Sequence, residues 1–197
     1  LERPETSFIG RESELARMQQ VIREGENGQK YQVLQIWGAS GAGKTSIINL
    51  IGRFYDIQRG KILIDSIDIR KMDKGFLRRQ VGIVLQDSFL FSGDIEYNIR
   101  LGEAGISPDL FREAARQANA HGFIEKLPKG YREEVQERGS TLSLGQKQLI
   151  SFARVLAFDP RIVILDEATS SVDTETEVLI RDAFTRLIKG RTSIIIA

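Results

Sequence analysis

The stretch Gly38-Ala39-Ser40-Gly41-Ala42-Gly43-Lys44-Thr45 decides how this chain can fold. It follows a compact apolar segment, 31–37, that is typical of a buried strand, and helical periodicity begins at Lys44. Glycines let consecutive backbone N–H groups turn inward without Cβ clashes, and a helix start adds the positive end of its dipole. The stretch therefore predicts an anion cradle between a strand and a helix.

These eight residues match the full P-loop pattern, including both flanking elements. Lys44 would place its ammonium on the outer phosphates of a nucleotide, and the Thr45 hydroxyl would ligate Mg²⁺. A glycine-rich turn with an incidental lysine is the alternative, but the number of matching positions disfavours it. The expected nucleotide contacts are Gly38, Ala39, Ser40, Gly41, Ala42, Gly43, Lys44, Thr45 and Ser46.

Two carboxylates, Asp166 and Glu167, follow a second apolar segment at 162–165. Ligands bind outside the carboxyl ends of parallel strands, so these acids are expected to face the phosphate site. Asp166 would hold Mg²⁺ through a bound water, and Glu167 would orient or deprotonate the attacking water. An isolated Asp-Glu pair is more often a solvated loop, but a P-loop in the same chain favours the catalytic interpretation.

Alternating strand and helix patterns predict an α/β domain: a P-loop NTPase (RecA-like) core with a largely parallel sheet and an inserted helical subdomain. We expect an atypical helical segment at 1–30, a core formed by 31–94 and 159–197, and the helical subdomain at 95–158.

Asp65 and Ser66 predict the turn of a short hairpin. Ser107 and Pro108 predict a helix start. The inward face of that helix is expected to be Leu110, Phe111, Ala114, Ala115 and Ala118. Further helices are predicted over 12–24, 145–158 and 175–189, and further strands over 81–85 and 193–196.

Composition narrows the function classes. The 197 residues include no cysteine, which excludes disulfides and thiolate metal sites. A net charge of +1 gives no general attraction to nucleic acid, and we expect no nucleic-acid partner. No apolar run approaches the roughly 18 residues that span a bilayer. The chain stops inside an apolar run, 193–197, so we expect it to be a fragment.

Residues 44–197 resemble the nucleotide-binding domain of ABC exporters through several motifs. Leu142-Ser143-Leu144-Gly145-Gln146 is similar to the family's signature motif, although Leu144 stands where glycine is usual. The spacing of Ser143 and Gln146 also predicts a capping box, which a helix needs without any ligand. The strings Val81–Asp87, Phe91–Ile95 and Asn98-Ile99 look like the Q-loop segment, Tyr131–Gly139 looks like the segment that touches the membrane domain, and Ser170–Asp173 resembles the D-loop.

The resemblance implies an ATPase that powers substrate export, with ATP and Mg²⁺ as its ligands. Two such domains would pair head to tail, and the transmembrane domain of an exporter would be the second partner, which places the chain in the cytoplasm at the cytosolic face of the membrane. The implied catalytic residues are Glu167, Gln86 and Lys44; the implied metal ligands are Thr45, Gln86 and Asp166. Ser143, Gly145 and Gln146 would clamp the γ-phosphate of an ATP held by the opposite protomer.

Two features depart from the exporter pattern. The family's histidine after the last strand is missing, and His121 is expected to be a packing or surface residue, so we expect weak turnover with retained binding. Residues Phe8–Leu15 and the segment after them resemble STAND and AAA-like ATPases, which suggests a hybrid. The alternative functions are a soluble STAND-type nucleotide switch and an ABC ATPase that works without a transporter.

Overall fold

The computed structural model describes residues 6–9, 16–24, 30–37, 44–57, 60–85, 88–135, 141–166 and 173–196, with side chains from Ser46 onward. The chain divides into two compact units. The first comprises 1–82, 161–164 and 190–197, and the second comprises 83–160 and 165–189. The helical subdomain expected at 95–158 falls within the second unit, which also takes in 83–94 and 165–189.

The main sheet has six strands in the order β1-β2-β3-β10-β9-β6. Strand β10 pairs with β3 in parallel, whereas β1, β2 and β3 pair with their neighbours as an antiparallel run. The sheet is therefore mixed, with an antiparallel edge. The strands are β1 (Thr6–Ile9), β2 (Ala16–Glu24), β3 (Lys30–Trp37), β6 (Val81–Val84), β9 (Ile162–Asp166) and β10 (Thr192–Ile196).

The helix expected over 12–24 is wrong where the structure describes that range, at 16–24. Residues Ala16–Glu24 form strand β2, whose register with β3 runs from Arg17 opposite Trp37 to Glu24 opposite Lys30. A short apolar pattern fits either a helix or a strand, and pairing along the whole length of β3 supplies the backbone hydrogen bonds that decide between them. The chain thus begins with the antiparallel strands that its sequence did not suggest.

A short hairpin in the first unit confirms the expected turn. Strands β4 (Leu63–Ile64) and β5 (Ile67–Asp68) pair antiparallel across Asp65 and Ser66, whose φ angles are 48° and 66°. Two consecutive positive φ angles are the mark of a type I′ turn, whose twist matches that of the flanking strands. Two helical segments follow, namely the 3₁₀ helix η1 (Ile69–Lys71) and α2 (Lys74–Gln80), which is capped by Asp73.

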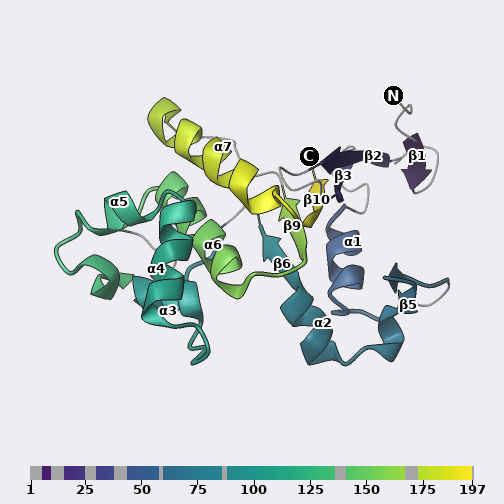
Figure 1. Cartoon of the computed structure of the whole chain (residues 1–197), viewed down its shortest axis with the longest axis horizontal. Helices are drawn as coiled ribbons and strands as arrows, with labels where there is room; N and C mark the ends of the chain where they lie inside the picture. Colours follow the sequence, from purple (N-terminus) through teal and green to yellow (C-terminus); the bar gives the residue numbers. More distant parts are fainter. Residues whose placement is uncertain are drawn as a thin grey trace. The chain divides into compact units, whose positions relative to one another are not determined.

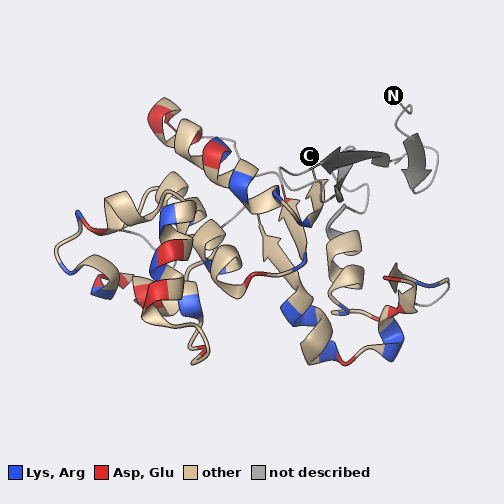
Figure 2. Cartoon of the chain, in the orientation of Figure 1, with Lys and Arg blue, Asp and Glu red and all other residues tan. Residues whose placement is uncertain are grey.

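The second unit is built around helix α6 (Leu144–Phe158). This helix packs against α3 (Ile95–Arg100), α4 (Pro108–Gln117) and α7 (Thr174–Ile188) (Figure 1). Its only charged residues are Lys147 and Arg154, whereas α4 and α7 carry acidic and basic side chains along much of their length (Figure 2). The difference follows from position, because a central helix must bury nearly its whole circumference. Fully buried side chains of this core include Ile95 and Ile99 on α3, Phe111 on α4, and Leu149, Ile150 and Phe152 on α6 itself.

Helix α4 begins as predicted, with the Ser107 hydroxyl accepting the backbone N–H of Leu110 and Pro108 in the first turn. The expected inward face is correct for Phe111 and for the three alanines, all of which are buried. It is wrong for Leu110, which is 46% exposed. At about 100° per residue, Phe111 and the three alanines fall within one arc of about 100° around the helix, and Leu110 lies outside that arc.

The remaining short elements of the second unit connect its helices. They are α5 (His121–Ile124), the 3₁₀ helix η2 (Gly130–Arg132), and strands β7 (Gly93–Asp94) and β8 (Glu134–Val135). Strands β7 and β8 pair antiparallel, with Gly93 opposite Val135. This pairing ties the segment after the expected Q-loop to the segment that precedes the signature motif.

Candidate functional site

The glycine-rich stretch lies between the elements that its pattern predicts. Strand β3 ends at Trp37, and helix α1 (Lys44–Ile51) begins at Lys44. The loop 38–43 and the side chains of Lys44 and Thr45 lie outside the described residues, so the cradle itself stays a prediction. What the backbone establishes is a helix N-terminus at Lys44, the end of a helix that attracts anions.

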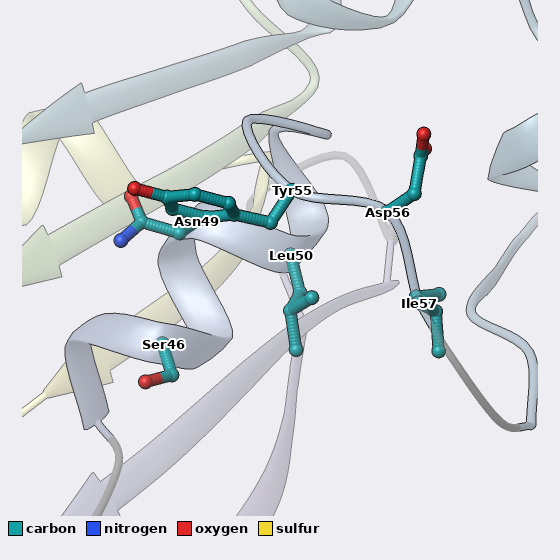
Figure 3. Close-up of a pocket in the computed structure, with 6 residues that line it drawn as sticks. All are labelled: Ser46, Asn49, Leu50, Tyr55, Asp56 and Ile57. Carbon is teal, nitrogen blue, oxygen red and sulfur yellow. The ribbon is translucent and has the colours of Figure 1, made fainter.

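Ser46 is exposed and lines a pocket of about 390 Å³ on the first unit (Figure 3). Helix α1 supplies one side of the pocket, and the segment after it supplies the other. The lining residues are Ser46, Asn49, Leu50, Tyr55, Asp56 and Ile57. Among these described lining residues, the only charged one is Asp56.

Asp166 is the last residue of strand β9 and is half-buried. The strand before it is buried through Val163, Ile164 and Leu165, which confirms the expected core strand. In the sheet β9 lies next to β10, and β10 lies next to β3, the strand that leads into the P-loop. Glu167 and Gln86 fall outside the described residues, and their roles stay predictions.

The signature segment forms the N-terminus of α6 as its spacing predicts. Ser143 is the N-cap: its Oγ accepts the backbone N–H of Gln146 at 3.2 Å, and its own N–H donates to Gln146 Oε1 at 3.0 Å. This capping box occupies two of the four amide donors that a helix start leaves free, those of Ser143 and Gln146. The amides of Leu144 and Gly145 are not used by the box.

The D-loop string 170–173 lies outside the described residues except for Asp173. This aspartate caps α7, because its carboxylate accepts the backbone N–H of Thr176 at 2.9 Å, and that hydrogen bond lowers its pKa. The segment Tyr131–Gly139 is described as far as Val135, where it forms η2 and β8. His121 lies half-buried in α5, and its Nδ1 is 2.8 Å from the hydroxyl of Tyr131, as expected for a packing residue.

Sequence reasoning missed Arg154, and it named Asn98 only as part of the Q-loop-like string. The two residues hold the segment 89–91 against α6. Arg154 donates to the backbone carbonyls of Asn98 and Phe89, and the fully buried amide of Asn98 bonds the backbone of Phe91. One signal was available, since Arg154 interrupts an otherwise apolar stretch of α6.

Two further features are absent from the described residues. Within them, no group of three or more histidine, cysteine or acidic residues could hold a metal ion. Across the same parts of the chain, no helix is both long and apolar enough to cross a membrane.

The arrangement of strands, helices and motifs described above agrees with the proteins that this chain resembles. The family model described as "ABC transporter" matches residues 27–170. The chain is 54% identical to the uncharacterized ABC transporter ATP-binding protein YfiC of Bacillus subtilis strain 168, over 84% of this chain and 28% of that protein. It is 50% identical to the ATP-dependent lipid A-core flippase of Syntrophus aciditrophicus, over 89% of this chain and 28% of the flippase.

Among solved structures, a bacterial Atm1-family ABC exporter with ATP bound matches with a TM-score of 0.76 and 40% identity, over 90% of this chain and 34% of the exporter chain. The fold is therefore that of an ABC ATPase, a P-loop NTPase. The chain belongs to the ABC transporter family, and it is an ATP-binding domain of the exporter type. It spans about 28% of the length of the curated relatives described above.

Proposed function

We propose that this chain binds and hydrolyses ATP to power export through the membrane domain of an ABC transporter. The observation that carries the proposal is the start of α6, where the signature segment forms a capped helix N-terminus with the amides of Leu144 and Gly145 left unused by the cap. A helix start of this kind attracts a phosphate. The relatives named as an ATP-dependent flippase and as a probable multidrug resistance ATP-binding/permease protein support the coupling to export.

The nucleotide would be held at the start of α1. The backbone amides of 38–43 would surround the phosphates, Lys44 would neutralise their charge, and Thr45 and Ser46 would complete the contacts. A helix that begins at Lys44, where the loop 38–43 that follows strand β3 ends, fits this role. The adenine contacts are not part of the proposal.

Hydrolysis would depend on the acids after β9. Asp166, half-buried at the strand end, is a hard oxygen ligand of the kind that Mg²⁺ prefers, and Thr45 and Gln86 would complete the set. When bound, the ion would neutralise charge that develops on the phosphates. Glu167 would accept a proton from the attacking water, or orient that water, as general base.

Two copies would assemble head to tail, as the resemblance to ABC exporters implies, and the start of α6 of each chain would receive the γ-phosphate of the nucleotide that the other chain holds. Ser143, Gly145 and Gln146 of one protomer would then face the nucleotide of the other, and a two-fold axis would create two equivalent sites. The transmembrane domain is the second proposed partner, and the cytosolic face of the membrane is the proposed location.

Binding and turnover of Mg·ATP test the proposal. Lys44→Ala should lose affinity, whereas Glu167→Gln should keep ATP bound and abolish turnover. The matched controls are Lys74→Ala in α2 and Glu175→Gln in α7, both on exposed residues, and neither should change binding or turnover. Full turnover in Glu167→Gln would remove that residue from catalysis, and a wild-type chain without affinity for Mg·ATP would refute the proposed function.

Mixing two inactive variants tests the head-to-tail assembly. A dimer of one Lys44→Ala chain and one Ser143→Arg chain keeps one intact site, which combines the P-loop of the second chain with the signature of the first. Turnover should therefore return on mixing. A mixture that stays as inactive as its components would show that the two motifs do not act across an interface.

A further inference from the structure

Arg154 is a half-buried cation that joins three elements of the second unit. Its Nε donates to the backbone carbonyl of Asn98 at 2.8 Å, and Nη1 and Nη2 each lie 3.3 Å from the carbonyl oxygen of Phe89. Nη2 also reaches the side-chain oxygen of Asn98 at 3.4 Å, and the guanidinium carbon lies 5.7 Å from the centre of the Phe91 ring. One side chain on α6 thus contacts both α3 and the segment 89–91.

Asn98 closes this segment from the other side. Its side-chain oxygen accepts the backbone N–H of Phe91 at 2.8 Å, and its Nδ2 donates to the carbonyls of Phe91 at 2.9 Å and Asp94 at 3.0 Å. The residue is 0% exposed, so each of these bonds is protected from water. The buried amide therefore fixes the backbone of 91–94 to the first turns of α3.

The chemistry of the site requires arginine. Burial lowers the pKa of Arg154 to about 10, and the guanidinium stays charged at neutral pH. Its planar set of donors can bond two carbonyl groups in different directions, whereas the single ammonium of a lysine cannot hold both positions. Its shorter hydrogen bonds go to the backbone oxygens of Asn98 and Phe89, so the side chain chiefly fixes the course of the main chain.

The network lies between two segments that are expected to contact nucleotide. Phe89 comes three residues after Gln86, the expected contact of metal and attacking water, and α6 begins directly after Ser143, the cap at the signature segment. A helix of 15 residues transmits a displacement of one end to the other, because its hydrogen bonds keep it rigid. Any shift of α6 therefore reaches the 89–91 segment through Arg154.

We propose that Arg154 and Asn98 are positioning residues that couple the segment carrying Gln86 to the signature helix. The inference rests on the function proposed above, since it assigns these residues to the same reaction. Neither residue touches the nucleotide; they set where the chain after Gln86 lies when α6 carries a bound phosphate at its start. Without the network, Gln86 would sample a wider range of positions, and fewer of them would be productive.

A distance measurement tests the positioning directly. Because the chain has no cysteine, spin labels can be placed at Asp87→Cys, next to Gln86, and at Asp109→Cys on α4, the helix that packs against α6. Double electron–electron resonance, recorded without nucleotide, then gives the distribution of distances between the two labels. We expect Arg154→Lys to broaden that distribution and Arg116→Lys, on an arginine that is 52% exposed, to leave it unchanged.

Kinetics separate a positioning role from a purely structural one. Arg154→Lys should lower kcat by about ten- to a hundredfold, with little change in KM for ATP, because a catalytic group that is displaced by about 1 Å loses rate while the nucleotide contacts persist. Should this variant lose its cooperative thermal transition, Arg154→Gln, which buries no unpaired charge, carries the same test.

The proposal is overturned if a folded Arg154 variant gives a distance distribution as narrow as that of the wild type. It is also overturned if the distribution broadens while kcat stays unchanged. A wild-type chain that does not hydrolyse ATP refutes the proposed function instead. The distance arm needs no nucleotide, so the two failures are distinguishable.

Discussion

The imidazole of His121 and the phenol of Tyr131 form a stacked, hydrogen-bonded pair between α5 and η2. The distance from His121 Nδ1 to the hydroxyl oxygen is 2.8 Å, and the two rings are inclined by 29° with centroids 5.9 Å apart. The ring of Phe111, from α4, meets Tyr131 edge-on at 5.3 Å. Tyr131 begins the segment that leads through β8 toward the signature motif, so this pair anchors that segment on the helical unit.

Ionisation of the Tyr131 hydroxyl lowers the free energy of unfolding at alkaline pH. Burial, with a smaller contribution from the Glu125 carboxylate, raises the pKa of Tyr131 to about 12 from its ordinary value of 10.0. Between these values the folded chain binds more protons than the unfolded chain, so stability is complete below pH 10 and falls as the pH rises toward 12. The Tyr131→Phe variant has no hydroxyl to ionise, so its stability does not fall for this reason. Urea unfolding at pH 9 should show the variant less stable by about 1 kcal/mol, from the lost hydrogen bond.

At pH 11 the difference between wild type and Tyr131→Phe should shrink, because only the wild type loses the tyrosine contribution. Other groups that titrate at this pH are common to both chains and cancel in the comparison. A difference that stays constant from pH 9 to pH 11 would show that Tyr131 ionises as freely in the folded chain as in the unfolded one.

Neighbouring residues of α4 should respond very differently to truncation. Phe111 is 0% exposed and packs on Tyr131, so Phe111→Ala should cost about 3–5 kcal/mol in the free energy of unfolding. Leu110, which is 46% exposed, should lose no more than about 0.5 kcal/mol on the same change. Urea denaturation of both variants checks the assignment of the buried face, and equal losses would contradict it.

The β4–β5 turn carries strain that one substitution can remove. Ser66 adopts a φ of 66°, a conformation that costs a residue with a Cβ about 1 kcal/mol and costs glycine nothing. Ser66→Gly should therefore raise the melting temperature by a few degrees, since Asp-Gly is a preferred type I′ sequence. Ser66→Val, the matched control, should lower it. An unchanged melting temperature in both variants would mean that the hairpin unfolds before the rest of the chain.

The features that the sequence predicted correctly are local ones. The hairpin turn at Asp65 and Ser66, the start of α4 at Ser107 and the capping box of α6 all depend on residues within a few positions of one another. Such signals need no knowledge of the fold, because the side chain and the amide it satisfies lie in the same short segment. The placement of the P-loop between β3 and α1 is predictable for the same reason.

The features that the sequence did not predict depend on distant partners. Residues 16–24 become a strand because β3 lies beside them, and their apolar spacing alone fits a helix equally well. Arg154 bonds Phe89, 65 residues away, through a backbone carbonyl. Every residue has such a carbonyl, so no residue type at position 89 could have indicated the contact.

The start of α6 allows the cap and the proposed phosphate clamp to be separated by one residue. Ser143→Ala removes the cap and should cost about 1 kcal/mol in the free energy of unfolding, whereas Ser143→Asp keeps an acceptor for the Gln146 amide and should keep the stability. A carboxylate at that position would, however, repel the γ-phosphate of the partner's nucleotide. Light scattering of the Glu167→Gln chain with Mg·ATP should show dimers. The double variant that carries both Glu167→Gln and Ser143→Asp should stay monomeric under the same conditions while keeping full thermal stability. Dimers that survive Ser143→Asp would reduce the signature segment to a well-capped helix start without a ligand.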